Sequence, residues 1–306
     1  MQKREQIARR TGAALGYNEC VTYSFIDHAA AALFGGGDDA TMLANPISAD
    51  LSHMRPDLLP GLLRAAARNQ ARGLMDLALF EVGHAFHGGE PGEQHLQVAG
   101  ILVGRTGPKD VHGATRVVDV FDAKADAEAI LAAIGAPAKV QILRDGPAWF
   151  HPGRHGRICL GPKKMLGIFG EVHPRILRAL DVKGPAVAFT LYPGEIPLPR
   201  KTSASRGALD ISDLQAVERD FAFVVDSRTE ALTLINAAAG ADKALIEDVR
   251  VFDAFSGGNL GEGKKSLALT VRLQPRDKTL TEADIEAVSA RIIEKVTKAT
   301  GGVLRG

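Results

Sequence analysis

A glycine-rich segment with two lysines is the part of this 306-residue sequence that comes nearest to a catalytic motif. Residues 258–265 read GNLGEGKK, close to the phosphate-binding loop GxxxxGK[ST]. Lys265 stands where serine or threonine would ligate Mg²⁺. The residues that follow predict a strand, not the helix whose N-terminus would hold phosphates. We therefore interpret the segment as a connection between two antiparallel strands.

Two pairs of histidines have spacings that invite comparison with metal ligands. His84 and His87 are three residues apart on a predicted strand, where side chains alternate, so they point to opposite faces. His151 and His155 would meet on a helix, but the proline and glycine between them disfavour one. Neither pair predicts a metal site.

The other ionisable residues form no recognisable catalytic group. Asp57, Asp76, Glu81 and Glu171 are scattered, with no spacing that defines a carboxylate pair. The motifs GxSxG, HExxH and GxGxxG do not occur. The sequence therefore predicts no catalytic residue and no cofactor bound by this chain itself.

The composition indicates an ordinary globular protein. Lys and Arg number 37 and Asp and Glu 36, a balance that excludes a protein gripping nucleic acid by overall charge. The two cysteines, Cys20 and Cys159, cannot form a disulfide framework and are typical of a reducing compartment. No apolar run reaches the roughly 18 residues of a membrane span.

Length and composition predict two domains. Residues 193–207 contain three prolines and short polar residues without periodicity, which is typical of a linker. We place the domains at residues 1–204 and 213–306, with residues 205–212 as the linker. The second domain has 13 basic and 15 acidic residues, so any grip on RNA there must be local.

The first domain combines helices with a larger number of strands. Because βαβ alternations are few, we expect a mostly antiparallel sheet with helices packed on it. The expected helices are 4–15, 58–74 and 122–134, and the expected strands are 21–25, 77–86, 96–103, 157–160, 165–172 and 186–191.

The second domain has the order of a known supersecondary unit. Strand 217–226, helix 229–239, strands 245–255 and 265–274, helix 282–299 and strand 302–305 follow one another. This βαββαβ order is that of the ferredoxin-like split βαβ unit. Thr281 followed by Asp284 predicts a capped start of the long helix. The predicted fold class is thus α+β.

Short phrases in a fixed order identify a family. They are LGYNECVTYSF (15–25), NPIS (45–48), MRPDLLPGLL (54–63), LFEVG (79–83), HPGR (151–154), GIFGEVHP (167–174), VERDFAF (217–223), VFD (251–253), KKSLA (264–268), KTLT (278–281) and LR (304–305). Over essentially its whole length, the chain resembles the C-terminal part of the β subunit of bacterial phenylalanine–tRNA ligases. The specificity lies in the order of the phrases.

The resemblance implies a role for each domain. The first is similar to a class II synthetase core that has lost catalysis and supports the catalytic α subunit, in an enzyme of two α and two β subunits. The second resembles a ferredoxin-fold anticodon-binding domain that contacts tRNA-Phe. ATP and Mg²⁺ are implied for the whole complex, with a cytoplasmic location and no membrane. The family's complete β subunit is longer, and its editing and Mg²⁺-linked segments have no counterpart here.

Loss of catalysis follows from comparison with class II cores, which place arginines around the phosphates of ATP. The comparable strand here, 79–83, carries Glu81 where a cation is needed. Strand 186–191 runs into Tyr-Pro-Gly-Glu, with no glycine-rich helix and no arginine before the linker. We expect no amino-acid activation by this chain alone.

The open face of the second sheet is the expected RNA site. In the strand 265–274 the leucines and Val271 should face the helices, which leaves small residues and Arg272 outward as a shallow floor for a splayed base. For Phe252 a place in the core is the simpler interpretation. The family usually has proline and a basic residue where this chain has Gln215 and Glu218. Residues expected to contact RNA are Arg219, Asp220, Phe252, Arg272, Gln274, Arg276 and Arg305.

Two other functions stay open at this point. Ferredoxin-like domains also bind small ligands, so the second domain could be a regulatory module on a degenerate synthetase core. A stand-alone ligase is the third interpretation. Fold alone cannot decide among them.

Overall fold

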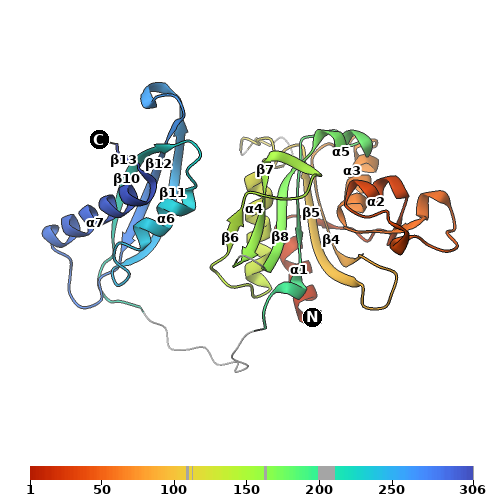
Figure 1. Cartoon of the computed structure of the whole chain (residues 1–306), viewed down its shortest axis with the longest axis horizontal. Coiled ribbons are helices and arrows are strands. Elements are labelled where there is room, and N and C mark those ends of the chain that lie inside the picture. The colour runs from red at the N-terminus through yellow and green to blue at the C-terminus, as the bar shows by residue number, and fades with distance from the viewer. Residues whose placement is uncertain (108–109, 112, 162–163, 199–210, 306) are drawn as a thin grey trace. The chain divides into compact units, whose positions relative to one another are not determined.

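The computed structural model describes residues 1–107, 110–111, 113–161, 164–198 and 211–305. Two compact units emerge, Met1–Thr202 and Ser203–Gly306. Each is shown in Figure 1 with its helices and strands labelled.

The first unit is built on one large sheet. Within the described residues its strand order is β1-β4-β5-β9-β8-β7-β6, and all neighbours are antiparallel except β1 and β4. The expected mostly antiparallel sheet is confirmed. The strands are β1 (Asn18–Glu19), β4 (Leu77–Phe86), β5 (Gln94–Val103), β6 (Gln141–Leu143), β7 (Phe150–Leu160), β8 (Lys164–Val172) and β9 (Ala186–Leu191).

Helices cover both faces of this sheet. The helices α1 (Gln2–Ala14) and α4 (Val120–Ala133) pack on one face, while α2 (His28–Leu33), α3 (Leu59–Gln70) and α5 (Pro174–Ala179) pack on the other (Figure 1). Strand β9 shows why both faces must be covered. Its Ala186 and Ala188 belong to the core under α3, and its Val187 and Phe189 to the core under α4. An unbroken apolar run is typical of such a strand.

The segment from Val21 to Phe25 differs from the expected strand. Only Phe25 joins a strand, the short β2 (Phe25–Ile26), which pairs with β3 (His53–Met54). Upstream, the amide and hydroxyl of Thr22 donate to the carboxylate of Glu81 at 3.3 and 2.7 Å. Val21 and Tyr23 are exposed. The Glu81 carboxylate thus accepts the hydrogen bond of the Thr22 amide, which a neighbouring strand would otherwise accept.

The predicted linker begins later than its composition suggests. A 3₁₀ turn, η3 (Pro193–Glu195), follows β9, and Arg4 donates from Nη1 to the carbonyls of Pro193 and Ile196 at 2.9 Å each. Ile196 is buried, so this part belongs to the first unit. Residues 205–210 of the predicted linker lie outside the described residues. Ser212, at its end, donates to the Pro275 carbonyl of the second unit at 2.6 Å. The domain boundaries themselves stay a prediction.

The second unit confirms the βαββαβ order. Its sheet has the order β11-β12-β10-β13, and every neighbouring pair is antiparallel. The helices α6 and α7 cover one face of this sheet. The core between them contains Phe223 and Leu269 from the strands and Leu234 and Ile292 from the helices. The elements are β10 (Val217–Asp226), α6 (Ala231–Ala239), β11 (Ile246–Ser256), the 3₁₀ turn η4 (Gly258–Leu260), β12 (Lys264–Leu273), α7 (Glu282–Thr300) and β13 (Val303–Leu304).

Two local predictions are confirmed in this unit. Thr281 and Asp284 form the capping box of α7, with the Asp284 amide donating to Thr281 Oγ1 at 3.3 Å and the Thr281 amide donating to Asp284 Oδ2 at 3.1 Å. After the glycine-rich segment the chain enters strand β12 at Lys264, not a helix. The helix N-terminus that a phosphate loop requires is therefore absent from this described segment.

Candidate nucleic-acid interface

The face of the second sheet opposite α6 and α7 is arranged in rows. The pairing of β10 with β12 fixes which residues lie side by side. From one end to the other, the rows are Glu218 with Arg272, Asp220 with Thr270, Ala222 with Ala268, Val224 with Ser266, and Asp226 with Lys264. This surface is the open face. It has a charged end at Glu218 and Arg272, and its rows from Ala222 to Ser266 form an apolar end that the charged row of Asp226 and Lys264 closes.

The apolar end of the open face has an aromatic residue at one edge and an arginine at the other. Ser266 lies between Val224 on β10 and Phe255 on β11, and Val303 of β13 extends the same row. Phe255 is 44% exposed and Val303 is 67% exposed. The Arg305 amide donates to the Ala222 carbonyl at 2.7 Å, so Arg305 borders the next row. Unpaired bases are bound by stacking on floors of this kind.

The charged end carries an ionic network across three strands. Arg272 on β12 donates from Nε to Glu247 Oε2 at 2.9 Å, and its Nη1 lies 3.7 Å from Glu218 Oε1. Arg250 on β11 lies 3.7 Å from the other oxygen of Glu218. The hydroxyl of Thr270 donates to Asp220 at 2.7 Å. Both arginines are thus paired with carboxylates on the open face.

The structure brings only some of the predicted RNA contacts together. Asp220 and Arg272 lie on the open face, and Arg305 lies at its edge. The side-chain amide of Gln274 donates to the carbonyls of Leu214 and Pro275 at 2.8 and 3.2 Å, so it is already engaged. Arg276 follows β12 in a loop. Their contact with RNA stays a prediction.

Arg219 and part of the predicted floor are placed differently. Arg219 is opposite Val271, a buried core residue. The register therefore places Arg219 on the helix-covered face, whereas Asp220 lies on the open face. Ser266 and Thr270 do lie on the open face, yet they are buried, on a strand that has β10 on one side and β11 on the other. The accessible floor is therefore narrower than the alternation of β12 suggests.

A β-bulge in β11 explains why the sequence analysis gave no role to Phe255. The register of β11 against β12 shifts between Val251 and Asp253, so Phe252 is the extra residue. Phe252 is 56% exposed, and the simpler interpretation that placed it in the core is wrong. Because the bulge reverses the alternation, Phe255 moves to the open face. One residue in the sequence indicates this bulge. Strict alternation along β11 would place Asp253 in the core, where an unpaired acid is unfavourable.

Most of the buried charge of the first unit lies in one ion pair. Arg55 Nη1 donates to Glu81 Oε1 at 2.8 Å, and their side chains are 5% and 4% exposed. Arg55 Nε donates to the His84 carbonyl at 2.9 Å, and Thr22 supplies a hydroxyl to Glu81. The acid on the synthetase-like strand is thus sealed by an internal cation, and its carboxylate has no room for a substrate.

Asp57 is a second buried acid near this pair. Its Oδ1 accepts hydrogen bonds from the Leu59 amide at 2.8 Å and from Thr190 Oγ1 at 3.3 Å. Burial raises the pKa of Asp57 to about 6, although these hydrogen bonds and Arg55 act in the opposite direction. The group therefore supports the start of α3, and its position inside the core gives it no access to solvent.

The histidines and acids form no metal centre in the described part of the chain. His87 and His95 lie 5.6 Å apart between ring centroids, and burial, followed by His87 and His84, lowers the pKa of His95. No group of three or more His, Cys, Asp or Glu residues among the described residues could hold a metal ion. Among the same residues, no helix is both long and apolar enough to cross a membrane.

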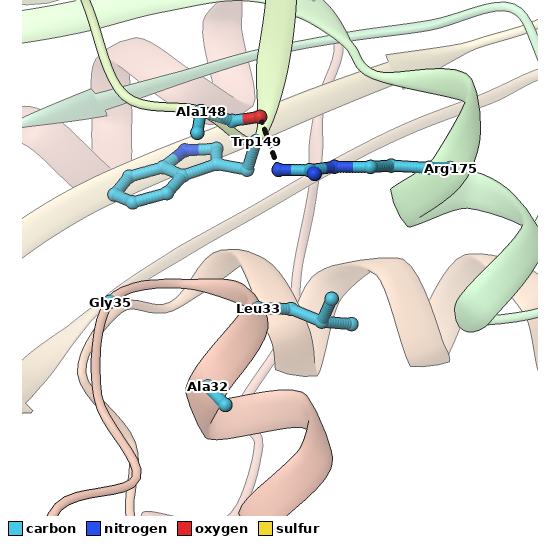
Figure 2. A pocket seen from close by; sticks show the side chains of 6 residues that line it. All are labelled: Ala32, Leu33, Gly35, Ala148, Trp149 and Arg175. Atoms are coloured by element: carbon cyan, nitrogen blue, oxygen red, sulfur yellow. Dashed lines mark hydrogen bonds between the residues drawn. The ribbon is translucent and has the colours of Figure 1, made fainter.

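A shallow hollow of about 450 Å³ lies on the first unit between α2 and the chain entering β7 (Figure 2). Arg175 donates from Nη2 to the Ala148 carbonyl at 3.1 Å, and Trp149 Nε1 is buried without a hydrogen-bond partner in the described structure. The groups around this hollow do not form a reactive set. The lining residues are Ala32, Leu33, Gly35, Ala148, Trp149 and Arg175.

Comparison with family models gives two matches that follow the two units. Residues 1–192 match the phenylalanyl tRNA synthetase beta chain CLM domain, and residues 212–305 match the ferredoxin-fold anticodon binding domain. A solved structure of a pyrrolysyl tRNA synthetase from Desulfitobacterium hafniense is 13% identical, with a TM-score of 0.49, over 63% of this chain and 64% of that one. At this identity and TM-score, the likeness supports no conclusion about this chain.

Curated relatives cover this whole chain with part of their own length. The phenylalanine–tRNA ligase beta subunit of Ruegeria pomeroyi is 77% identical over 305 residues, which are 100% of this chain and 38% of that protein. The subunit of the same name from Rhodospirillum rubrum is 53% identical over 99% of this chain and 38% of its own length. Since the first family model alone matches more than half of its residues, the chain belongs to the phenylalanyl-tRNA synthetase beta chain family.

Proposed function

We propose that this chain is the assembly and anticodon-binding part of a phenylalanine–tRNA ligase β subunit and does not itself catalyse aminoacylation. The open face is the observation that carries the proposal. An apolar floor flanked by Phe255 and Arg305 suits an unpaired base, which is read by stacking and by its exposed edges. The charge balance of the chain as a whole offers no competing general affinity for RNA.

We expect Phe255→Ala to weaken binding of tRNA-Phe by roughly 5- to 150-fold at low salt. The ring borders the apolar rows and is accessible, and stacking of one base on an aromatic side chain contributes about 1–3 kcal/mol. The measurement is a titration of labelled tRNA-Phe with the full chain, combined with nuclease protection of the anticodon loop.

Phe121→Ala is the matched control, since Phe121 is an exposed phenylalanine on α4 of the first unit. It should leave the affinity unchanged. Equal affinities for all three proteins, or protection outside the anticodon loop, would remove the open face as the binding site. A thermal shift with free phenylalanine and none with tRNA would instead favour a small-ligand regulatory module.

The residues of the first unit do not fit ATP with Mg²⁺. Strand β4 carries Glu81, and Arg55 forms a buried ion pair with that carboxylate. A phosphate brought to Glu81 would meet a carboxylate whose paired cation is already engaged. We therefore assign ATP and Mg²⁺ to the rest of the complex.

The chain alone is expected to show no phenylalanine-dependent exchange of pyrophosphate into ATP. The physical reason is the lack of fixed cations for the charge that develops on the phosphates. The assay uses the purified full chain, with the assembled enzyme as the positive control. Exchange above background that survives removal of every trace of α subunit would refute the assignment.

Support for assembly comes from exposed apolar side chains near the start of the chain. Val21, Tyr23 and Ile47 lie on connections between short elements and are strongly exposed. Apolar side chains that lie together on a surface are typical of a protein interface, and these three are the residues that we assign to one. We propose the α subunit as the partner, in a cytoplasmic enzyme of two α and two β subunits, which co-elution of the two subunits tests.

A further inference from the structure

Glu218 connects the two arginines of the charged end of the open face. One of its oxygens lies 3.7 Å from Arg272 Nη1 and the other lies 3.7 Å from Arg250 Nη2. Glu247 adds a hydrogen bond of 2.9 Å to Arg272. Three strands contribute to the network, so each guanidinium is held by carboxylates that come from other strands.

The charges at the charged end of the open face do not favour a phosphate backbone. The rows from Glu218 to Ala222, with their β11 and β13 neighbours, hold three arginines and five carboxylates among the described residues. An approaching phosphate would have to displace a carboxylate from Arg272 or Arg250, and it would meet the remaining acids at close range. The members are Arg250, Arg272, Arg305, Glu218, Asp220, Glu247, Asp248 and Asp253.

The apolar end has the opposite character. Val224, Ser266 and Ala268 carry no charge, and they lie next to Phe255. A base can stack there without a counter-ion, and carboxylates or a paired guanidinium nearby can accept or donate hydrogen bonds to base edges. The two ends together suit RNA bound through its bases with its phosphates directed outward.

We propose that Glu218 is a specificity-determining residue of this RNA-binding face. It neutralises Arg250 and Arg272, so that affinity depends on which bases are presented and not on phosphate charge. The inference rests on the proposed anticodon-binding function and adds to it the class of contact. Removing the Glu218 charge should make Arg250, and the part of Arg272 that Glu247 does not hold, available for phosphate contacts that any RNA can use.

The test is Glu218→Gln in the full chain, with binding measured as a function of salt concentration. The probes are a tRNA-Phe transcript and the same transcript with its three anticodon bases substituted. We expect the slope of log K against log salt to steepen by about 0.7 for each phosphate newly contacted. The substituted transcript should gain affinity by up to about fivefold, as for an exposed ion pair, and more than the cognate transcript gains.

Glu286→Gln is the matched control, because it removes the same charge from an exposed position on α7, on the helix side of the sheet. Its slope should equal that of the wild type. Arg272→Ala in the wild-type background should weaken binding with little change of slope, whereas added to Glu218→Gln it should cancel part of the steepening. This cycle separates a released arginine from a general change of net charge.

The outcomes distinguish this inference from the function on which it rests. If the wild type protects the anticodon loop but Glu218→Gln keeps the wild-type slope and discrimination, the role of Glu218 is refuted and anticodon binding stands. If the wild type binds both transcripts equally, without protecting the anticodon loop, both proposals fail. A steeper slope with weaker discrimination supports both.

Discussion

Replacing Arg55 by alanine is expected to lower the free energy of unfolding of the first unit by about 3–5 kcal/mol. The change leaves Glu81 as an unpaired carboxylate in the core, and breaking a buried ion pair from one side has a cost of this size. Arg55 also holds the His84 carbonyl through Nε, so a backbone acceptor loses its donor as well. Denaturant unfolding followed by the fluorescence of Trp149, the single tryptophan, reports on this unit.

Arg154→Ala is the matched control for this measurement. Arg154 lies 2.6 Å from Glu171 but is about half exposed, and surface ion pairs contribute about 0–1 kcal/mol. The double variant Arg55→Met with Glu81→Leu should recover much of the stability, because apolar residues of similar volume replace the pair. A loss no larger for Arg55→Ala than for Arg154→Ala would show that the pair is solvated and that its cation is available.

The regular elements could be predicted closely because local patterns specify them. Strands β4, β9 and β10 begin and end at the predicted residues, since each is an apolar or alternating run bounded by turn residues. The capping box of α7 needs only Thr281 and its neighbour three positions on. The phrases that identify the family are equally local, which is why membership could be inferred from the amino-acid sequence alone.

Features set by distant residues could not be predicted in the same way. The sequence showed that Glu81 is an acid on the synthetase-like strand, but not that Arg55, which is 26 residues away, neutralises it. It also gave no position for the bulge at Phe252, so Phe255 was assigned no role. The first feature is a side-chain contact between distant residues. The second is set by the pairing of β11 with β12, where one inserted residue reverses which face a side chain occupies.

These two long-range features have opposite consequences for function. In the Arg55–Glu81 pair, the cation beside the acid of β4 is buried and already engaged, so it does not hold a phosphate. The bulge in β11 brings Phe255 onto the open face beside Val224 and Ser266, where a base can stack. Both features agree with the proposed role of this chain, which binds RNA and does not activate an amino acid.

Asp57→Asn is expected to remove a pH-dependent penalty on the stability of the first unit. The folded-state pKa of Asp57 is about 6, above its ordinary value of 3.8, because burial disfavours the charged form. The folded state therefore binds the proton more tightly, and stability falls as the pH rises from about 4 to about 6. A shift of about 2 units corresponds to roughly 3 kcal/mol, present below pH 4 and lost above pH 6.

The difference between variant and wild type isolates this group, because the two proteins share every other ionisable residue. The asparagine Oδ1 can still accept the Leu59 amide, so the start of α3 is kept. The variant should match the wild type near pH 4 and be more stable by up to about 3 kcal/mol near pH 7. Asp145→Asn, which alters an exposed pair with Arg157, should change stability by less than about 1 kcal/mol. A difference curve for Asp57→Asn that is flat from pH 4 to 7 would show that Asp57 is ionised in the core.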